Sequence, residues 1–230
     1  MELNLQHLKN KHGLDINGII HVGAHKAEEL DDYLSIGVKN IIWIEVHSHL
    51  IPFIEDKIKN SSMKAVSGFQ WPIATANQQV FNYLVSDADD NIENFYVSSN
   101  IKSSSILKPK KHLEKHPHVK FNEPIQIKTI TLDTVMVKES VDTNNYNFIN
   151  MDVQGAELKV LKGATSLLHN IDYIYSEVNI SELYENCVLI EEMDNFLQPF
   201  GFERVETEIN AYDWGDALFI KNKSKVTNGR

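Results

Sequence analysis

Five short apolar runs, separated by segments of helical length, constrain this chain more than any other feature of its sequence. The runs are Gly18–Val22, Asn40–Val46, Val80–Val85, Tyr146–Val153 and Tyr173–Val178. Strands buried on both faces read as nearly continuous apolar runs, and parallel strands need crossover connections, usually helices. Apolar residues at helical spacing follow the first, second, fourth and fifth runs. The pattern predicts an α/β fold with a mostly parallel sheet and helices on both faces.

The last third of the chain predicts a different connection. Two further strand candidates, 202–206 and 216–220, are too close in sequence for a crossover helix between them. We therefore expect these two strands to pair antiparallel.

The region of about 91–131 departs from the alternating pattern. The helix expected after the third run is missing or displaced, and a strand-like Phe95–Val97 and a basic segment, Leu107–Lys120, take its place. Long irregular segments in compact domains are often lids or binding loops. We predict one domain over residues 1–222, in which this insertion covers the acceptor site, and a polar tail at 223–230.

Length, charge and cysteine content exclude several classes of protein. The 230 residues suit one domain, and 42% apolar residues suffice for a sizeable core. The formal net charge of −10 argues against nucleic acid as the partner, because phosphate binding needs a basic surface. A single cysteine, Cys187, excludes an internal disulfide and a cysteine-rich zinc site.

The apolar runs are also too short for a membrane protein. None approaches the roughly 18 apolar residues that cross a bilayer, and the N-terminus lacks an apolar run of signal-peptide length. We expect a cytoplasmic protein without membrane insertion. Its oligomeric state stays open, with a homodimer among the alternatives.

Polar residues or a glycine mark the point where each predicted strand ends. The residues concerned are Gly23, Glu45, Ser86, Asp87, Asp152 and Glu177. The carboxyl ends of parallel strands meet in one crevice, which is where open α/β sheets bind their ligands. The sequence therefore predicts a binding site that these residues share.

Gly23 and Glu45 narrow the kind of ligand. A glycine after the first strand allows close backbone approach, and an acid 22 positions later can accept hydrogen bonds from ribose hydroxyls. The two other glycines of a dinucleotide fingerprint are absent, and Glu28 and Glu29 put negative charge where a phosphate would sit. A nucleoside without phosphates fits this loop better than NAD, FAD or ATP.

The histidines have competing interpretations. His21 and His25 either position a ligand or cap the strand end, and no cluster with metal-ligand spacing stands out, so no metal site is predicted. His112, His116 and His118 lie among lysines, either as a solvated face or as a contact for an anion or acidic substrate.

Several segments together resemble the FkbM family of methyltransferases over about residues 16–222. The matching segments are Ile19–Glu29, Trp43–Glu45, Ser103–Ile106, Asn150–Glu157, Leu161–Ala164, Tyr175–Asn179 and Trp214–Leu218. The resemblance implies a Rossmann-like class I methyltransferase fold, with a seven-stranded sheet whose last strand is antiparallel. It also implies S-adenosylmethionine as the methyl donor, and O-methylation, often in pathways for glycans or other secondary products.

The resemblance also implies roles for individual residues. Gly23 and Ala24 would approach the methionine part of the donor, Glu45 its ribose, and Ser86 with Asp87 its adenine. The predicted cofactor site as a whole consists of His21, Gly23, Ala24, His25, Glu45, Val46, Ser86, Asp87 and Asp152. One departure is clear, because His21, His25 and Ala27 occupy positions where the general class I pattern has an acid and further glycines.

Methyl transfer to a hydroxyl needs a group that orients the acceptor and takes its proton. Asp152 is the first candidate for this catalytic role and Glu177 the second, although Asp152 could instead cap the next helix. The predicted acceptor contacts are Ser104, Ser105, Gln154, Asn179 and Trp214.

We predict methylation of a hydroxyl on a sugar, a glycan or a related small molecule. The alternatives are an adenosyl-binding module of the same fold with weak catalysis, and a NAD-dependent oxidoreductase.

Overall fold

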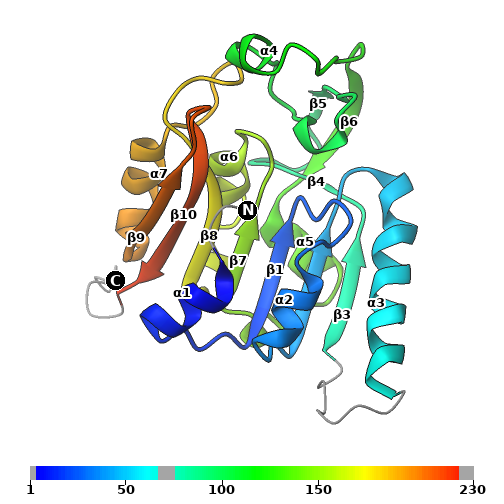
Figure 1. The fold of residues 1–230 in the computed structure, drawn as a ribbon, viewed down its shortest axis with the longest axis vertical. Helices are drawn as coiled ribbons and strands as arrows, with labels where there is room; N and C mark the ends of the chain where they lie inside the picture. The colour runs from blue at the N-terminus through cyan, green and yellow to red at the C-terminus, as the bar shows by residue number, and fades with distance from the viewer. Residues whose placement is uncertain (1–3, 67–75, 223–230) are drawn as a thin grey trace.

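The structure, a computed structural model, describes residues 4–66 and 76–222, in which ten strands form two sheets. The main sheet has seven strands in the order β3-β2-β1-β7-β8-β10-β9 (Figure 1). Its strands are β1 Gly18–Val22, β2 Asn40–Ile44, β3 Asn77–Phe81, β7 Phe148–Met151, β8 Tyr173–Asn179, β9 Phe202–Ile209 and β10 Trp214–Lys221. Strand β10 is antiparallel to both of its neighbours, and all other pairs are parallel. The predicted class I methyltransferase sheet, with its antiparallel last strand, is confirmed.

Helices cover both faces of the main sheet. They are α1 Leu5–His12, α2 Leu30–Ser35, α3 Ile51–Val66, α5 Leu132–Lys138, α6 Glu157–Lys162 and α7 Ile190–Leu197, with 3-10 turns η1 Ser48–Leu50, η3 Thr143–Asn145, η4 Leu167–His169 and η5 Gln198–Phe200. Side chains of α1, α2 and α3 pack on one face, and those of α5, α6 and α7 on the other. The sequence did not predict α1.

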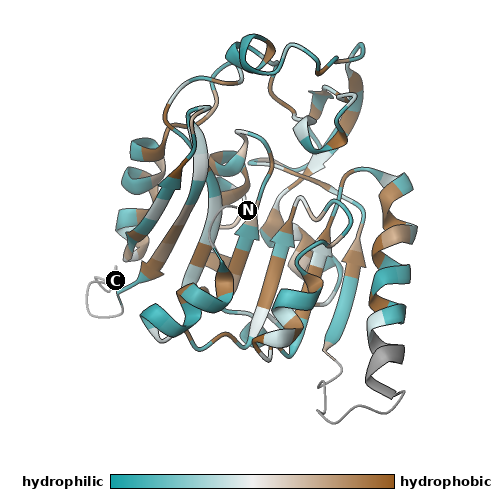
Figure 2. Ribbon diagram, in the orientation of Figure 1, coloured by the Kyte–Doolittle hydropathy of each residue, from teal (hydrophilic) through white to brown (hydrophobic). Residues whose placement is uncertain are grey.

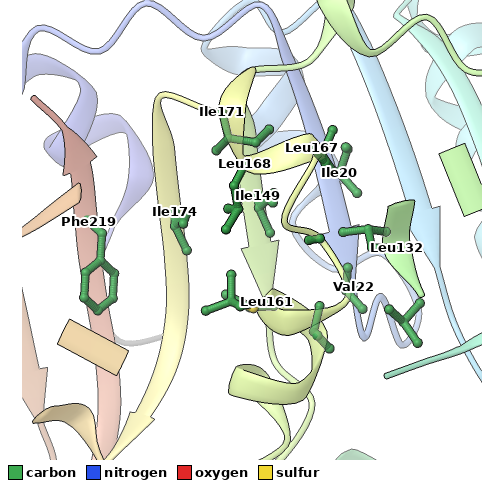
Figure 3. Close-up of a cluster of buried hydrophobic side chains, with 14 of the residues drawn as sticks. Ile20, Val22, Leu132, Ile149, Leu161, Leu167, Leu168, Ile171, Ile174 and Phe219 are labelled. Carbon is green, nitrogen blue, oxygen red and sulfur yellow. The ribbon is translucent and has the colours of Figure 1, made fainter. Parts of the chain in front are cut away.

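Each central strand supplies apolar side chains to both layers. On β1, Ile20 and Val22 join the core cluster of α5 to α7, whereas Ile19 joins the opposite cluster, because side chains alternate along a strand. Figure 2 shows the central strands coloured mostly hydrophobic, and Figure 3 shows Ile149 near Leu168 and Ile20 near Leu167 within the first cluster. No helix in the described residues is long and apolar enough to span a membrane.

The third predicted strand is wrong in its extent. Strand β3 ends at Phe81, and Leu84–Val85 form β4 in a second, three-stranded sheet of order β4-β6-β5. The side-chain amide of Asn82 donates hydrogen bonds to the backbone oxygens of Glu45 and Val46 at 2.7 and 2.9 Å. This turn ties the chain to the end of β2 and directs it out of the main sheet.

The region predicted as an insertion forms most of the second sheet. It contains β5 Ile92–Phe95, the 3-10 turn η2 Ile101–Ser103, helix α4 Lys111–Lys115 and β6 Ile125–Ile130. These elements lie beyond the carboxyl ends of the main strands (Figure 1), and α5, the displaced helix, follows β6. We call residues 95–121 the cover. The polar tail predicted at 223–230 lies outside the described residues.

Gly23 is where β1 and β7 meet most closely. A Cβ atom at this residue would lie 2.0 Å from the backbone oxygen of Asp152, and its φ of +85° is in the left-handed region. The backbone N–H groups of Gly23 and Ala24 both donate to the backbone oxygen of Ile44. The missing side chain therefore serves the contact between strand ends, in addition to the ligand approach predicted from the sequence.

We predict that Gly23→Ala destabilises the protein far more than Gly37→Ala. Gly37 has nearly the same φ, +83°, but open space where its Cβ would be, so its variant measures the backbone cost alone, about 1–2 kcal/mol. Gly23→Ala should cost at least about 2 kcal/mol more, because backbone atoms must move. Chemical denaturation of both variants tests this, and equal losses would contradict the close-contact explanation.

Candidate active site

A cavity of about 400 Å³ lies at the carboxyl ends of the main strands, between the sheet and the cover. Its lining comes from the ends of β1, β2, β7 and β8, from the start of β10, and from the cover. The volume lies within the range of small-molecule sites, and the strand order reverses between β1 and β7, where such sheets bind ligands.

Most of the predicted site residues line this cavity. They are His21, Gly23, Ala24, His25, Glu45, Val46, Ser104, Asp152, Gln154, Glu177 and Trp214. Ser86, Asp87, Ser105 and Asn179 do not line it.

The four residues outside the cavity have identifiable places in the fold. Ser86 is buried and Asp87 exposed beyond β4, because the chain has left the main sheet after β3. Ser105 donates from Oγ to the backbone oxygen of Gln154 at 2.8 Å, so it fastens the cover to the turn after β7. Asn179 is fully buried, and neither polar atom of its side chain has a partner in the described part of the chain.

Glu45 closes the loop that follows β1. Its carboxylate accepts hydrogen bonds from the backbone N–H groups of His25 and His47, each at 2.8 Å, and only 4% of the residue is exposed. Burial raises the pKa of Glu45 to about 7 despite these hydrogen bonds. The lone pairs left on its oxygens remain able to accept from hydroxyl groups in the cavity.

His21 is a buried, uncharged wall residue. Its Nδ1 lies 3.0 Å from the Tyr33 hydroxyl, and its ring packs against Tyr33 and Trp43, which stack on each other. Burial lowers the pKa of His21 to about 4 against the pull of nearby carboxylates. This supports the interpretation of His21 as a polar cap of the strand end that also lines the cavity.

His25 connects the loop after β1 to the cover. With a φ of +46° it occupies a left-handed conformation, and its Nδ1 lies 2.7 Å from Oε1 of Glu28. Lys102, on the cover, pairs with the same oxygen at 3.0 Å. Although burial opposes ionisation, the hydrogen bonds from Lys102 and His25 lower the pKa of Glu28 to about 2.

Asp152 and Glu177, which we call the carboxyl pair, are bridged by one amide group. Nε2 of Gln154 donates to Oδ1 of Asp152 at 2.7 Å and to Oε2 of Glu177 at 2.8 Å. Asp152 caps no helix, since α6 begins at Glu157 with Ala156 at its N-cap. This excludes the helix-cap alternative for Asp152.

Other acids surround the carboxyl pair. Asp152 is exposed and lines the cavity, and the surrounding protein raises its pKa. Burial, together with the charges of Asp152, Glu157 and Asp216, raises the pKa of Glu177 well above its ordinary range. The surroundings therefore disfavour the ionised forms of the carboxyl pair.

Gln154 is held by residues on both sides of the cavity. It has a left-handed φ of +57°, and its Oε1 lies 3.0 Å from the hydroxyl of Tyr184, which is also 2.9 Å from the backbone oxygen of Ser103. A non-glycine residue in this conformation is strained and often functional. Sequence reasoning missed Tyr184, because no motif marks its segment.

The described residues contain no group of three or more histidine, cysteine or acidic side chains arranged to hold a metal ion.

The strand order and the polar strand ends define the class I methyltransferase architecture, with a nucleoside-sized cavity at its carboxyl edge. A family model described as the methyltransferase FkbM domain matches residues 21–204. The chain belongs to this family of S-adenosylmethionine-dependent methyltransferases.

Individual relatives are more distant. The 2-O-methyltransferase NoeI of Sinorhizobium fredii is 35% identical over 98 residues, which are 43% of this chain and 40% of that protein. The match thus spans less than half of the length of that relative.

Two solved structures have partly similar folds. A SAM-dependent methyltransferase from Aquifex aeolicus is 12% identical, over 94% of this chain and 89% of that chain, with a TM-score of 0.48. Magnesium protoporphyrin IX methyltransferase from Synechocystis is 9% identical, over 89% and 69% of the two chains, with a TM-score of 0.44.

The raised pKa values predict that the protein loses stability between pH 6.5 and pH 8. A carboxyl group whose pKa is higher in the folded than in the unfolded state stabilises the fold until the pH passes the folded value. Glu45 and Glu157 both have a pKa of about 7 against an ordinary 4.5, so each should cost on the order of 1 kcal/mol over this interval. The buried histidines act in the opposite direction, mostly below their ordinary pKa of 6.5, and they offset part of this loss above it.

Matched variants isolate the contribution of Glu45. Glu45→Gln should reduce the loss of unfolding free energy between the two pH values, whereas Glu55→Gln, at an exposed position on α3, should not. Denaturant unfolding at pH 6.5 and pH 8 measures this difference. The same pH dependence in wild type and Glu45→Gln would refute the assignment.

Proposed function

We propose that this protein transfers the methyl group of S-adenosylmethionine to a hydroxyl oxygen of a sugar, a glycan or a related small molecule. The observation that carries the proposal is the cavity in which Glu45 lies at the end of β2 and the bridged carboxyl pair at the ends of β7 and β8. Family membership supports the donor, and the acceptor rests on the chemistry of the site.

The residues at the β1 and β2 side suit a nucleoside. Glu45 would accept hydrogen bonds from the ribose hydroxyls, and the loop of Gly23 and Ala24 would face the methionine part of the donor. Apolar side chains beside Glu45, those of Val46, Leu84 and Phe95, line the same cavity. They suit the adenine ring better than Ser86 and Asp87, which lie outside the cavity.

The charge of the cavity also suits a sulfonium donor. Six acidic residues line it, namely Glu28, Glu29, Glu45, Asp152, Glu177 and Asp216, and Lys102 is the one lysine or arginine among its described lining residues. Lys102 is already paired with Glu28. A ligand with positive charge therefore gains Coulomb attraction here, whereas a phosphate-bearing nucleotide does not.

S-adenosylmethionine supplies the methyl group as an electrophile on a positively charged sulfur. The acceptor oxygen forms the new bond to the methyl carbon while the carbon–sulfur bond breaks, and the hydroxyl proton must pass to a base. Asp152 is our candidate for this base, because it faces the cavity and is fixed by Gln154. Glu177, whose pKa is raised well above its ordinary range, would orient the acceptor and hold Gln154 in place.

The relative from Sinorhizobium fredii supports an oxygen acceptor. Its name describes a 2-O-methyltransferase, so a protein with partly similar sequence transfers methyl groups to oxygen. A sugar ring that carries hydroxyl groups is the acceptor that fits a cavity lined by carboxyl, amide and aromatic side chains.

We expect Asp152→Asn to lower methyl transfer by at least about 100-fold, because the base is lost while the shape is kept. Binding of S-adenosylhomocysteine should change by less than about fivefold, since loss of a proton acceptor mainly affects turnover. Radiolabelled transfer to a panel of methyl glycosides and calorimetric titration measure the two quantities. Asp87→Asn is the matched control, because this acid lies outside the cavity, and it should leave both unchanged. Turnover of Asp152→Asn within a few-fold of wild type would contradict the assignment of the base.

Thermal unfolding with two ligands separates the donor classes. S-adenosylhomocysteine should raise the melting temperature and NAD should not, because the loop after β1 offers acidic side chains where a pyrophosphate would lie. Stabilisation by NAD alone would refute the methyltransferase proposal. Binding of S-adenosylhomocysteine without transfer to any hydroxyl acceptor would favour a binding module.

A further inference from the structure

The cavity extends beyond the proposed donor site toward β8 and β10. Its lining there comes from His112 and His116 of the cover, from Tyr184, and from Trp214 at the start of β10. Because the ribose and methionine positions lie at β1 and β2, this half of the cavity is left for the acceptor.

His112 is the most unusual side chain in this half. It is 5% exposed, it lines the cavity, and its Nδ1 has no hydrogen-bond partner within the described residues. Its ring centroid lies 4.9 Å from that of His116, 5.3 Å from Tyr184 and 5.5 Å from Phe121. A buried ring nitrogen without a partner costs free energy, and a ligand hydroxyl that reached this inaccessible nitrogen from the cavity would remove that cost.

Tyr184 places His112 next to the carboxyl pair. The Tyr184 ring packs against His112, and its hydroxyl lies 3.0 Å from Oε1 of Gln154, whose amide nitrogen bridges Asp152 and Glu177. A ligand bound by His112 would therefore lie close to the groups assigned to the reaction.

The lysines of the basic segment Leu107–Lys120 do not line the cavity, unlike Lys102 earlier in the cover. Lys108 pairs with Glu185 at 3.3 Å, Lys110 pairs with Glu182, and Lys115 pairs with Asp213. These ion pairs fasten the cover to the segment after β8 and to the loop before β10. Because these lysines are paired with acidic side chains of the protein itself, they give no support to the alternative in which the basic segment contacts an anion.

Burial disfavours the charged forms of His112 and His116, which line the cavity. Burial lowers the pKa of His112 to about 4, with further contributions from His116 and His118, and burial also lowers the pKa of His116. His112 and His116 thus present hydrogen-bonding aromatic rings to the cavity, apart from Lys102, which is paired with Glu28.

We propose that this half of the cavity is a subsite for an uncharged sugar ring, in which His112 hydrogen-bonds an acceptor hydroxyl and positions it beside the carboxyl pair. The inference rests on the proposed methyl transfer and adds the charge of the acceptor and the residue that holds it. The rings of Tyr184 and Trp214 offer flat surfaces to the apolar face of a sugar. A phosphorylated or sulfated sugar would instead meet the carboxyl pair and Asp216, with Lys102 held by Glu28.

The first test compares acceptors and variants by radiolabelled methyl transfer. Methyl glycosides of pentoses and hexoses are the uncharged probes, and the phosphate esters of the same sugars are the charged ones. His112→Asn should raise the KM of the best methyl glycoside by about tenfold, the effect of one lost hydrogen bond, with kcat within about threefold. His7→Asn, at an exposed position on α1, is the matched control and should change neither.

The second test needs no turnover and uses the wild-type protein saturated with S-adenosylhomocysteine. The imidazole NMR signals of His112, assigned with His112→Asn and His112→Gln, should shift when methyl glycosides are added and should stay unchanged with the phosphate esters. Tighter binding of a phosphate ester, an unchanged KM in His112→Asn, or no glycoside that shifts the His112 signal would each overturn the inference. Failure of S-adenosylhomocysteine itself to bind would instead overturn the proposed function.

Discussion

The backbone contact between the ends of β1 and β7 is the constraint on which the site depends. Gly23 lies against the backbone oxygen of Asp152 with no room for a side chain, and its N–H is bonded to the end of β2. This contact brings the loop after β1, the acid of β2 and the acid of β7 to one edge of the sheet. Loop and acids then share one cavity because the strands are parallel, which puts their carboxyl ends side by side.

The same edge gathers acidic side chains at a cost to stability. The surrounding protein raises the pKa values of Glu45, Asp152, Glu157 and Glu177, so their ionised forms are disfavoured. Gln154 adds a strained left-handed backbone at the centre of the carboxyl pair. Such strain and unfavourable charge are typical of sites shaped for a ligand, and a positively charged donor would relieve the repulsion.

The fold could be predicted largely from the sequence, because apolar runs report burial on both faces of a strand. Four of the five runs correspond to strands of the main sheet near their predicted bounds, whereas Val80–Val85 is divided by a turn that depends on the distant oxygens of Glu45 and Val46. The strand-end residues Glu45 and Asp152 were predictable for the same reason. Tyr184 and the orientation of the cover were not, because they depend on contacts between segments far apart in the chain.

A crystal structure of the complex with S-adenosylhomocysteine tests the central claim most directly. The account predicts ribose hydroxyls within hydrogen-bond distance of Glu45, adenine against Val46, Leu84 and Phe95, and sulfur facing the carboxyl pair. It also predicts that space remains between that sulfur and His112 for an acceptor. A nucleoside bound elsewhere, or one that fills the histidine side of the cavity and leaves Glu45 without a ligand contact, would contradict the account.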